Sequence, residues 1–410
     1  MILYRLAMAV AFPVLTGMAL IEAVRGRIPV AGVAERLGGG SAPGRTDVWL
    51  HAASVGELTS VRTLLDAVLA ARPALRLVIT CNSGAGRALA GAWGLPRTQV
   101  ALAPFDLGWT LARFVARHGP QALCLVESEF WPERIFRMAE RPVAVVGARI
   151  SARSAARWTR FAPGLMRRML GGVRLLSAQD AGSEARFLGL GLAPERVGPR
   201  VMLKARIVPA EQAPPFAPPV PRARCLLAAS SHPGEDEVVL DAFMAARRAG
   251  QFSHLILAPR HPQRASAIAA LVARRGLTLA RRSRGEVPGA ATDVHLADTM
   301  GEMAHWYRMA GATVIGGTFG ALGGHTPYEP AAYGSAILHG PDVANFVDAF
   351  AALDAAGGAV ALAGASELAA ALSALNDTAQ TRLAANARAA LERDDRTAEL
   401  AAALIEVLER

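Results

Sequence analysis

The sequence has little cysteine and no spacing typical of a metal site. Its three cysteines, Cys81, Cys124 and Cys225, lie far apart and form none of the short pairs found in zinc sites or redox motifs. Each stands in or beside an apolar run typical of a strand, so we expect buried free thiols in a reducing compartment. The nine histidines form no metal-ligand cluster. We therefore expect neither a metal nor another cofactor.

Lysine is scarcer still. Lys204 is the only lysine among the 44 lysine and arginine residues. A bias toward arginine that spared one position suggests that a compact, flexible ammonium is needed there, because a planar guanidinium does not make the same contacts. The alternative is the chance survival of one codon.

Charged residues are also sparse, at 19% of the chain, and the mean hydropathy is +0.27. This composition is typical of apolar α/β proteins and of membrane-associated enzymes. The formal net charge of +10 and the pI near 10.7 would fit a nucleic-acid binder, but no basic block is interleaved with aromatic residues. We therefore expect no nucleic-acid partner, and a membrane surface or an anionic substrate explains the charge equally well.

An uncharged apolar run occupies Leu6–Ile21, and Pro13 interrupts it. A helix of this length reaches about 24 Å, against roughly 30 Å of hydrocarbon in a bilayer. The run therefore fits a shallow anchor or a short tilted insertion better than a complete span. A cleaved signal peptide and a helix buried in the fold are the alternatives. If the run inserts, the arginines that follow it place the body of the protein in the cytoplasm: Arg25, Arg27 and Arg36.

Apolar runs of strand length alternate with helical segments on both sides of a proline-rich stretch, 208–222. This alternation predicts an α/β protein with parallel sheets, and 410 residues suffice for two or three domains. We predict a membrane anchor in 1–27, a Rossmann-like domain in 28–207, a linker in 208–222, and a second Rossmann-like domain with C-terminal helices in 223–410. Such proteins bind ligands at strand ends that face a central cleft.

Acidic residues follow two predicted strands of the first half. Glu57 comes just after the strand 48–52, where a carboxylate can act as a general base. Ser54 and Glu57 also match a capping box, so closing a helix N-terminus is an equal alternative. Glu127 and Glu129 follow another strand beside aromatic residues, and they suit a polyhydroxylated substrate or a developing positive charge. Helix capping is again the alternative.

Three turns of the second half each close a strand and open a helix. They contain His232, then Arg260 with His261, and then Glu302, which matches a second capping box with Thr299. Arginine can pair with a phosphate, and histidine can donate a hydrogen bond to one. Together the three turns favour a nucleotide site in the second domain.

The stretch Gly311–Phe346 combines an apolar strand, a glycine-rich loop and a helix that starts at Pro327. Glycines allow close approach of the backbone to a ligand, and a helix N-terminus favours a phosphate. Glu329, in the first turn, can accept two hydrogen bonds from a ribose diol. Glycine-rich turns occur in many α/β proteins, however, and a glutamate in a first helical turn is ordinary dipole compensation.

Taken together, the motifs of the chain resemble those of the 3-deoxy-D-manno-octulosonic acid (Kdo) transferases. In order they are AERLG at 34–38, HAASVGE at 51–57, ESEFWPE at 127–133, GARISARSA at 147–155, SSHPGEDE at 230–237, APRHPQR at 258–264, DTMGEM at 298–303, and GGHTPYEPAAYG through GPDVANF at 323–346. The resemblance covers nearly the whole chain, and motifs in this order and spacing are highly specific.

The resemblance implies a GT-B fold and an inverting glycosyltransferase that moves Kdo from CMP-Kdo to a lipid A precursor, in lipopolysaccharide biosynthesis at the inner membrane. It implies Glu57 as the catalytic base, with Glu127 and Lys204 supporting the transition state. It assigns CMP-Kdo binding to Pro259, Arg260, Gly301, Glu302, Met303, Thr326, Pro327, Tyr328 and Glu329. Further contacts with the acceptor or the donor fall on Ser54, Gly56, Glu129, Arg149, His232, His325 and Asn345. It implies no catalytic metal.

Three segments depart from the family pattern. Gly147 and Thr326 stand where the family usually has asparagine, and 198–205 differs from the usual Gly-Asn/Ser-Leu-Lys-Phe-Asp run. The resemblance therefore leaves open the acceptor, the number of sugars added and the nucleotide affinity. The rival hypotheses are a divergent GT-B transferase with another donor or acceptor, and a sugar-nucleotide-binding membrane protein without catalysis. Retention of Glu57, Glu127 and Lys204 argues against the second.

Overall fold

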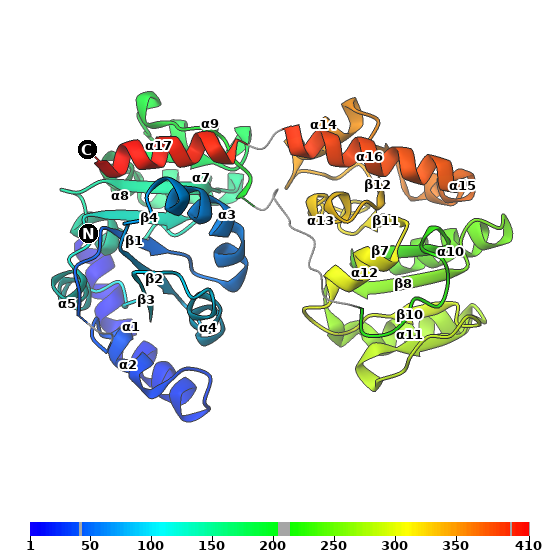
Figure 1. Ribbon diagram of the computed structural model, residues 1–410, viewed down its shortest axis with the longest axis horizontal. Coiled ribbons are helices and arrows are strands. Elements are labelled where there is room, and N and C mark those ends of the chain that lie inside the picture. The colour runs from blue at the N-terminus through cyan, green and yellow to red at the C-terminus, as the bar shows by residue number, and fades with distance from the viewer. Residues whose placement is uncertain (41–42, 204–213, 394–395, 410) are drawn as a thin grey trace. The chain divides into compact units, whose positions relative to one another are not determined.

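The structure is a computed structural model that describes residues 1–40, 43–203, 214–393 and 396–409. Lys204 and residues 208–213 of the predicted linker lie outside the described residues. The chain divides into two compact units, Met1–Lys204 with Asp395–Arg410, and Ala205–Asp394. Each unit is an α/β layer structure, as the alternation of apolar runs predicts (Figure 1).

The first unit is built on a six-stranded sheet in the order β3-β2-β1-β4-β5-β6, and all neighbouring strands are parallel. Its strands are β1 (Val48–His51), β2 (Leu77–Cys81), β3 (Thr98–Leu102), β4 (Ala122–Val126), β5 (Val143–Ala148) and β6 (Leu175–Ala178). Most strand residues are buried, because helices cover both faces of the sheet. Two apolar cores result, one containing Leu58 and Leu64, the other Trp49 and Phe114.

The helices of this unit are α1 (Ile2–Val24), α2 (Val30–Arg36), α3 (Val55–Ala71), α4 (Gly84–Ala92), α5 (Gly108–His118), α6 (Pro132–Arg137), α7 (Ala152–Phe161), α8 (Pro163–Gly172), α9 (Ala181–Gly189) and α17 (Thr397–Glu409). Several begin at side-chain caps: Ser54, Ser83, Ser151 and Asp180 each accept a backbone N–H of the first turn. Helix α1 extends beyond the uncharged run at both ends. Among the described residues, it is the one helix whose length and composition would allow it to cross a membrane.

The second unit contains a seven-stranded parallel sheet in the order β13-β12-β11-β7-β8-β10-β9. Its strands are β7 (Cys225–Ser231), β8 (His254–Pro259), β9 (Leu279–Arg281), β10 (Val294–Leu296), β11 (Ala312–Ile315), β12 (Ala336–His339) and β13 (Ala359–Ala361). Its helices are α10 (Glu235–Arg248), α11 (Ala265–Arg274), α12 (Met303–Met309), α13 (Tyr328–Ala332), α14 (Val347–Ala355), α15 (Leu368–Ala374) and α16 (Asp377–Arg393).

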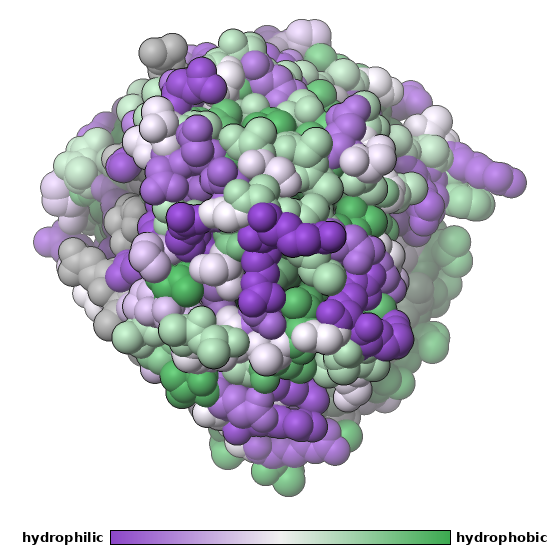
Figure 2. Space-filling view, turned by 90° about the vertical axis from the view of Figure 1, so that its right-hand side faces the viewer, coloured by the Kyte–Doolittle hydropathy of each residue, from purple (hydrophilic) through white to green (hydrophobic). Residues whose placement is uncertain are grey.

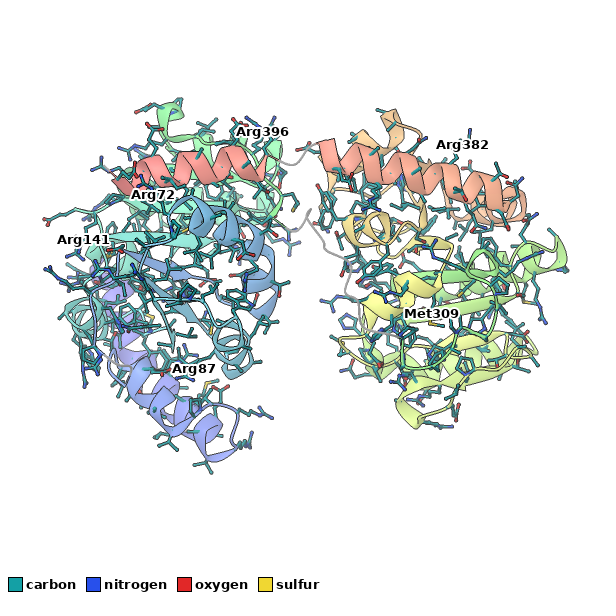
Figure 3. The ribbon with its side chains drawn as sticks, in the orientation of Figure 1. Arg72, Arg87, Arg141, Met309, Arg382 and Arg396 are labelled. Carbon is teal, nitrogen blue, oxygen red and sulfur yellow. The ribbon has the colours of Figure 1, made fainter. Side chains whose placement is uncertain are left out.

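The last helix corrects the predicted domain that ran to residue 410. Helix α17 packs along α3 in the first unit, as Figure 1 shows, and buries Leu400, Ala401 and Leu404 in the apolar core that contains Leu58 and Leu64 of α3. Arg72, labelled in Figure 3 at the end of α3, pairs with Glu409 at the end of α17. The order of the sequence suggests that a C-terminal helix belongs to the second domain, which comes just before it. Helix α17 instead buries its apolar stripe against the first unit.

Leu400→Ala tests this assignment, since Leu400 is fully buried against α3. We expect a loss of about 2–5 kcal/mol in the unfolding free energy of the first unit, the range for deleting a buried leucine side chain. Native-state hydrogen exchange should show faster opening of strands β1 and β2, with the second unit unchanged. Leu322→Ala, at a half-exposed position, is the control. Destabilisation confined to β7–β13 would contradict the packing described.

Candidate active site

The sheet of the first unit has its topological switch point between β1 and β4. From β1 the chain moves outward to β2 and β3, and it then returns to β4 and moves the other way to β5 and β6. Open α/β sheets bind ligands at the carboxyl ends of the strands at such a point. Glu57 lies in the first turn of α3, just after β1. Glu127 and Glu129 lie in the loop after β4, and the residue after β5 is Arg149. The topology therefore brings these four predicted residues to one edge.

Glu57 forms the capping box that the sequence suggests. Ser54 is the N-cap of α3, and its Oγ accepts the Glu57 backbone N–H at 3.2 Å. In return, Glu57 Oε2 accepts the Ala53 backbone N–H at 2.7 Å. The carboxyl group is thus fixed in direction by the backbone that follows β1.

The pKa of the Glu57 carboxyl is shifted further than a capping role requires. Burial, and then the negative charges of Glu127 and Glu129, raise its pKa to about 7, although the Ala53 N–H opposes the shift. A carboxyl with a pKa near the working pH can take up a proton and release it again. Capping and general-base chemistry are therefore compatible at this residue.

Glu127 has a positive φ of 57°, which is uncommon for a residue with a side chain. Its backbone N–H donates to the Val146 carbonyl at 3.0 Å, so the turn is held by β5. Strained conformations of this kind concentrate at functional sites, where surrounding structure imposes them. The strain supports a functional reading of the Glu127–Trp131 loop.

A buried histidine, which the sequence analysis did not single out, holds Glu129. His51 Nε2 lies 3.1 Å from Glu129 Oε2, and its Nδ1 lies 2.9 Å from Thr80 Oγ1. The Trp131 indole N–H also donates to Glu129, at 2.7 Å. Burial acts to raise the pKa of Glu129, but the His51 and Trp131 hydrogen bonds outweigh it and lower that pKa. Glu129 is therefore a fixed negative charge, distinct in character from Glu57.

The remaining predicted residues of this edge are more open. Ser54, Gly56 and Arg149 are exposed, and the Ser128 hydroxyl donates to the Arg149 carbonyl at 2.8 Å. This bond joins the loop after β4 to the residue after β5. Lys204 lies outside the described residues, so its predicted role is not placed by the structure.

The sheet of the second unit has its switch point between β7 and β11. All of its strands are parallel, so the turns after β11, β7, β8 and β10 emerge at one edge in that order. These are the four turns that the sequence singles out, since they hold His325, His232, Arg260 and Glu302.

Glu235, which the sequence analysis did not single out, organises the centre of this edge. Its carboxylate accepts the backbone N–H groups of His232 at 2.9 Å, Gly317 at 2.8 Å and Phe319 at 3.2 Å. Gly316 passes so close to Ser230 that an added Cβ would lie 2.3 Å from its carbonyl oxygen. Glycine is required there by the approach of two chain segments to each other.

His232 and His325 form a stacked pair beside Glu235. Their Nε2 atoms are 2.8 Å apart, and the ring planes are 5° from parallel. Burial, together with the neighbouring His232 and Arg260, lowers the pKa of His325 to about 4, and burial also lowers the pKa of His232. Both rings are therefore neutral near pH 7, and one Nε2 donates to the other. His261 lies edge-on to His232, with ring centroids 5.9 Å apart.

The turn around Glu302 differs from the predicted capping box. Helix α12 begins only at Met303, so Glu302 itself is the N-cap residue, and Gly301 has a positive φ of 87°. The Glu302 carboxylate pairs with Arg282 at 2.6 Å and receives the Thr299 hydroxyl. The Arg282 hydrogen bond lowers the pKa of Glu302. The acid is thus used to hold the turn, and no side-chain cap forms.

The glycine-rich loop leads into a short helix. Pro327 is the N-cap of α13, whose five residues start at Tyr328, and the Tyr328 N–H donates to Thr326 Oγ1 at 3.3 Å. So short a helix has a weak dipole, which reduces its value as an anion site. Burial raises the pKa of Glu329, and its carboxylate receives no hydrogen bond from the residues described. An acceptor without a partner fits the predicted ribose contact.

Asn345 holds the loop in place. Its side-chain N–H groups donate to the carbonyls of Leu322 at 2.9 Å and Gly324 at 3.1 Å. Its side chain also lies where Gly323 would place a Cβ, at 2.6 Å. Within the described ranges, no three histidine, cysteine or acidic side chains gather in a way that could hold a metal ion.

Comparisons with known proteins agree on one family. Residues 31–207 match the family model described as 3-deoxy-D-manno-octulosonic-acid transferase (kdotransferase). A 3-deoxy-D-manno-octulosonic acid transferase of Bordetella pertussis is 34% identical over 331 residues, which cover 78% of this chain and 77% of that protein. The transferase of the same name from Haemophilus influenzae is 30% identical over 323 residues, covering 76% of this chain and 75% of that protein.

Solved structures show the same fold at much lower identity. A glycosyltransferase of Rickettsia africae has a TM-score of 0.58 and 9% identity, covering 89% of this chain and 98% of that one. The UDP-GlcNAc 2-epimerase of Neisseria meningitidis has a TM-score of 0.55 and 12% identity, covering 88% of this chain and 99% of that one. The likeness extends over most of the chain, and with the two parallel sheets of this protein it confirms the predicted α/β fold class of the GT-B type.

Glu127→Gln tests the coupling within the first unit. Removing this negative charge should lower the pKa of the Glu57 carboxyl from about 7, while burial, the larger cause, keeps it above its ordinary value. The measurement is a carboxyl ¹³C NMR titration of Glu57. Glu140→Gln, at an exposed position outside the strand-end loops, is the control and should leave the titration unchanged. An identical titration in the Glu127 variant would mean that the two carboxyl groups do not interact.

Proposed function

The chain belongs to the 3-deoxy-D-manno-octulosonic acid (Kdo) transferase family, and on this premise we propose that it transfers Kdo from CMP-Kdo to a lipid A precursor. The chain is accordingly a glycosyltransferase of lipopolysaccharide biosynthesis. The acceptor, the stereochemistry and the residue roles that follow are parts of the proposal.

One observation carries the proposed mechanism: a directed carboxyl with a pKa of about 7 at the switch point of the first unit. A sugar hydroxyl is a poor nucleophile until a base removes its proton as the new bond forms. Glu57 is held by Ala53 and flanked by Glu127 and Glu129, which disfavour its charged form. This arrangement makes it a stronger base than an ordinary glutamate.

In the proposed step, the acceptor oxygen attacks the anomeric carbon of Kdo while its proton passes to Glu57. The bond between that carbon and the CMP phosphate oxygen breaks, and CMP leaves with the electron pair. Attack from the face opposite CMP inverts the configuration. Positive charge grows at the sugar, where Glu127 is proposed to stabilise it, and negative charge grows on the phosphate, where Lys204 is proposed to act.

The second unit is proposed to bind the donor. Glu329 offers a carboxylate to the ribose hydroxyls, and Arg260, exposed after β8, offers a guanidinium to the phosphate. Pro259, the turn Gly301–Met303 and the residues Thr326–Tyr328 provide backbone contacts. His232 and His325 present ring nitrogens at the same edge. We propose that the reaction needs no cofactor besides this donor.

The apolar helix α1 is proposed to hold the protein at the inner membrane, where a lipid acceptor lies. The units are proposed to face the cytoplasm, because Arg25, Arg27 and Arg36 follow the apolar run. The supporting observation is the exposure of the helix, in which Ala19 alone of the described residues is buried.

Mass analysis of the lipid product tests the proposal directly. Purified protein, CMP-Kdo and a lipid A precursor, incubated with excess EDTA, should yield a lipid heavier by one or more Kdo units, with release of CMP. A donor carrying another sugar acid is the control. Absence of product with CMP-Kdo, or activity only with the other donor, would contradict the assignment. Activity that EDTA abolishes and a divalent metal restores would contradict cofactor independence.

Glu57→Gln separates the two roles of this residue. The amide oxygen can still accept the Ala53 N–H, so the cap remains, but the base is lost. We expect turnover to fall by about 10² or more, with CMP affinity and thermal stability nearly unchanged. Ser83→Ala is the matched control, because it removes the cap of α4 at a cost of about 0.5–2 kcal/mol and leaves Glu57 and its partners in place. Near-normal turnover in the glutamine variant would show that Glu57 acts only as a helix cap.

The pH profile should report the same group. The pKa of Glu57 is raised, so its proton-accepting form disappears as the pH falls through about 7. On the acid side, kcat/KM should therefore decline about tenfold per pH unit. The residual activity of Glu57→Gln should lack this limb. An acid limb centred near the ordinary glutamate pKa, or its persistence in the glutamine variant, would identify a different base.

A further inference from the structure

Helix α1 contacts the first unit along a single stripe. The Tyr4 hydroxyl donates to Asp106 Oδ2 at 2.6 Å, and Arg5 pairs with Glu133. Two turns beyond Arg5, Phe12 meets the rings of Trp109 and Phe105 edge-on, with ring centroids 5.7 and 6.4 Å away. Ala19 is buried in the core, and Ala23 packs against it. Contacts spaced by three or four residues run through nearly the whole helix, so α1 lies along the body of the unit.

The first of these contacts is anchored in the fold. Asp106 is 4% exposed, and its carboxylate also accepts the backbone N–H groups of Glu133 and Arg134, both at 2.9 Å. It therefore caps α6 from one side and receives Tyr4 from the other. Pulling α1 away would leave a buried carboxylate with one bond fewer and a buried Glu133 without Arg5.

The outward face of α1 is apolar where a helix in water would be polar. Between Leu6 and Ile21 it carries no charged residue. Its large side chains are more than half exposed: Ile2, Leu3, Leu6, Val10, Val14, Met18, Leu20, Ile21 and Val24. Figure 2 shows an ordinary protein surface for contrast, a mosaic in which hydrophilic residues interrupt the apolar ones. A continuous apolar strip of this length marks a binding surface.

From these two faces we propose that α1 lies flat in one leaflet of the bilayer, with its outer face in lipid and its inner face on the protein. The helix is long enough to span, at about 34 Å for its length. Spanning would, however, carry the contacts at Tyr4, Arg5 and Phe12 across the membrane. Either those contacts would break, or Asp106 and Glu133 would enter hydrocarbon, where an acidic side chain is costly.

Lipid, as the occupant, fits the surroundings of the strip. Arg25 and Arg27 are exposed just past its end, where they can meet anionic headgroups. Trp109 is half exposed and packs on Phe12. A tryptophan beside an apolar helix is typical of residues that lie at the membrane–water interface. A specific protein partner is usually oriented by hydrogen bonds at the rim of an interface. The exposed side chains of the strip are apolar and offer no such bonds, which favours lipid over a protein partner. The proposal rests on the membrane association proposed above, but its tests do not depend on sugar transfer.

The first test is vesicle binding of Val10→Asp against Val287→Asp. Both valines are exposed, at 79% and 64%, so neither change should impair folding, and Val287 belongs to the second unit. With vesicles about one-third anionic, we expect the position 10 variant to bind about tenfold or more weakly. The position 287 variant should bind as the unchanged protein does. Equal binding of both variants, or a loss of self-association without a loss of vesicle binding, would overturn lipid as the occupant.

The second test distinguishes lying from spanning. A neutral, protease-cleavable tag fused ahead of Met1 should be cut in inverted inner-membrane vesicles and protected in spheroplasts, because a flat helix keeps both ends on one side. The opposite pattern would show that α1 spans. Tyr4→Phe keeps the helix apolar and removes only the bond to Asp106. We expect it to bind vesicles normally but to accelerate hydrogen exchange in α1 and α6 severalfold. Unchanged exchange would mean that Tyr4 does not hold the helix to the body.

Discussion

The proposed chemistry depends on a conflict of charges around the Glu57 carboxyl. The start of α3 and the Ala53 N–H favour its ionised form, whereas burial, Glu127 and Glu129 disfavour it, and the second group prevails. The same hydrogen bond that closes the helix also aims the carboxyl along the edge where β1 and β4 end. The capping box and the base are therefore two consequences of one geometry.

The second unit has a carboxylate, that of Glu235, at the place that corresponds to Glu57. Glu235 stands, like Glu57, in the first turn of the helix after the first strand of its sheet. It accepts three backbone N–H groups, where Glu57 accepts one. A carboxylate so fully bonded joins two loops. The two acids share a position in the fold but differ in the backbone donors around them, so position alone does not decide what such a carboxyl group does.

The periodic features of the chain were predictable from its sequence. Alternating apolar runs on both sides of the proline-rich stretch predict the parallel sheets of the two units, and the structure contains both. Strands β6, β9 and β13 lie at the sheet edges and are only three or four residues long, so their apolar signal in the sequence is weak. The placement of α17 depends on a contact with α3 that is distant in sequence. The strand-end acids of the site were found because strand ends are visible in a sequence, but the pairs His51–Glu129, His232–His325 and Arg282–Glu302 require the register of neighbouring strands.

The donor-binding assignments differ in how much freedom the fold leaves each side chain. Glu302 is engaged by Arg282 and Thr299, and Asn345 by two loop carbonyls, so both shape turns that a ligand would meet through the backbone. Glu329 is half-buried, and no described residue donates to its carboxylate. Burial raises the pKa of this carboxyl because it disfavours the charged form, and a diol that donates hydrogen bonds to the carboxylate would offset that effect. The environment of Glu329 therefore favours a ligand more directly than that of Glu302, which Arg282 and Thr299 already engage.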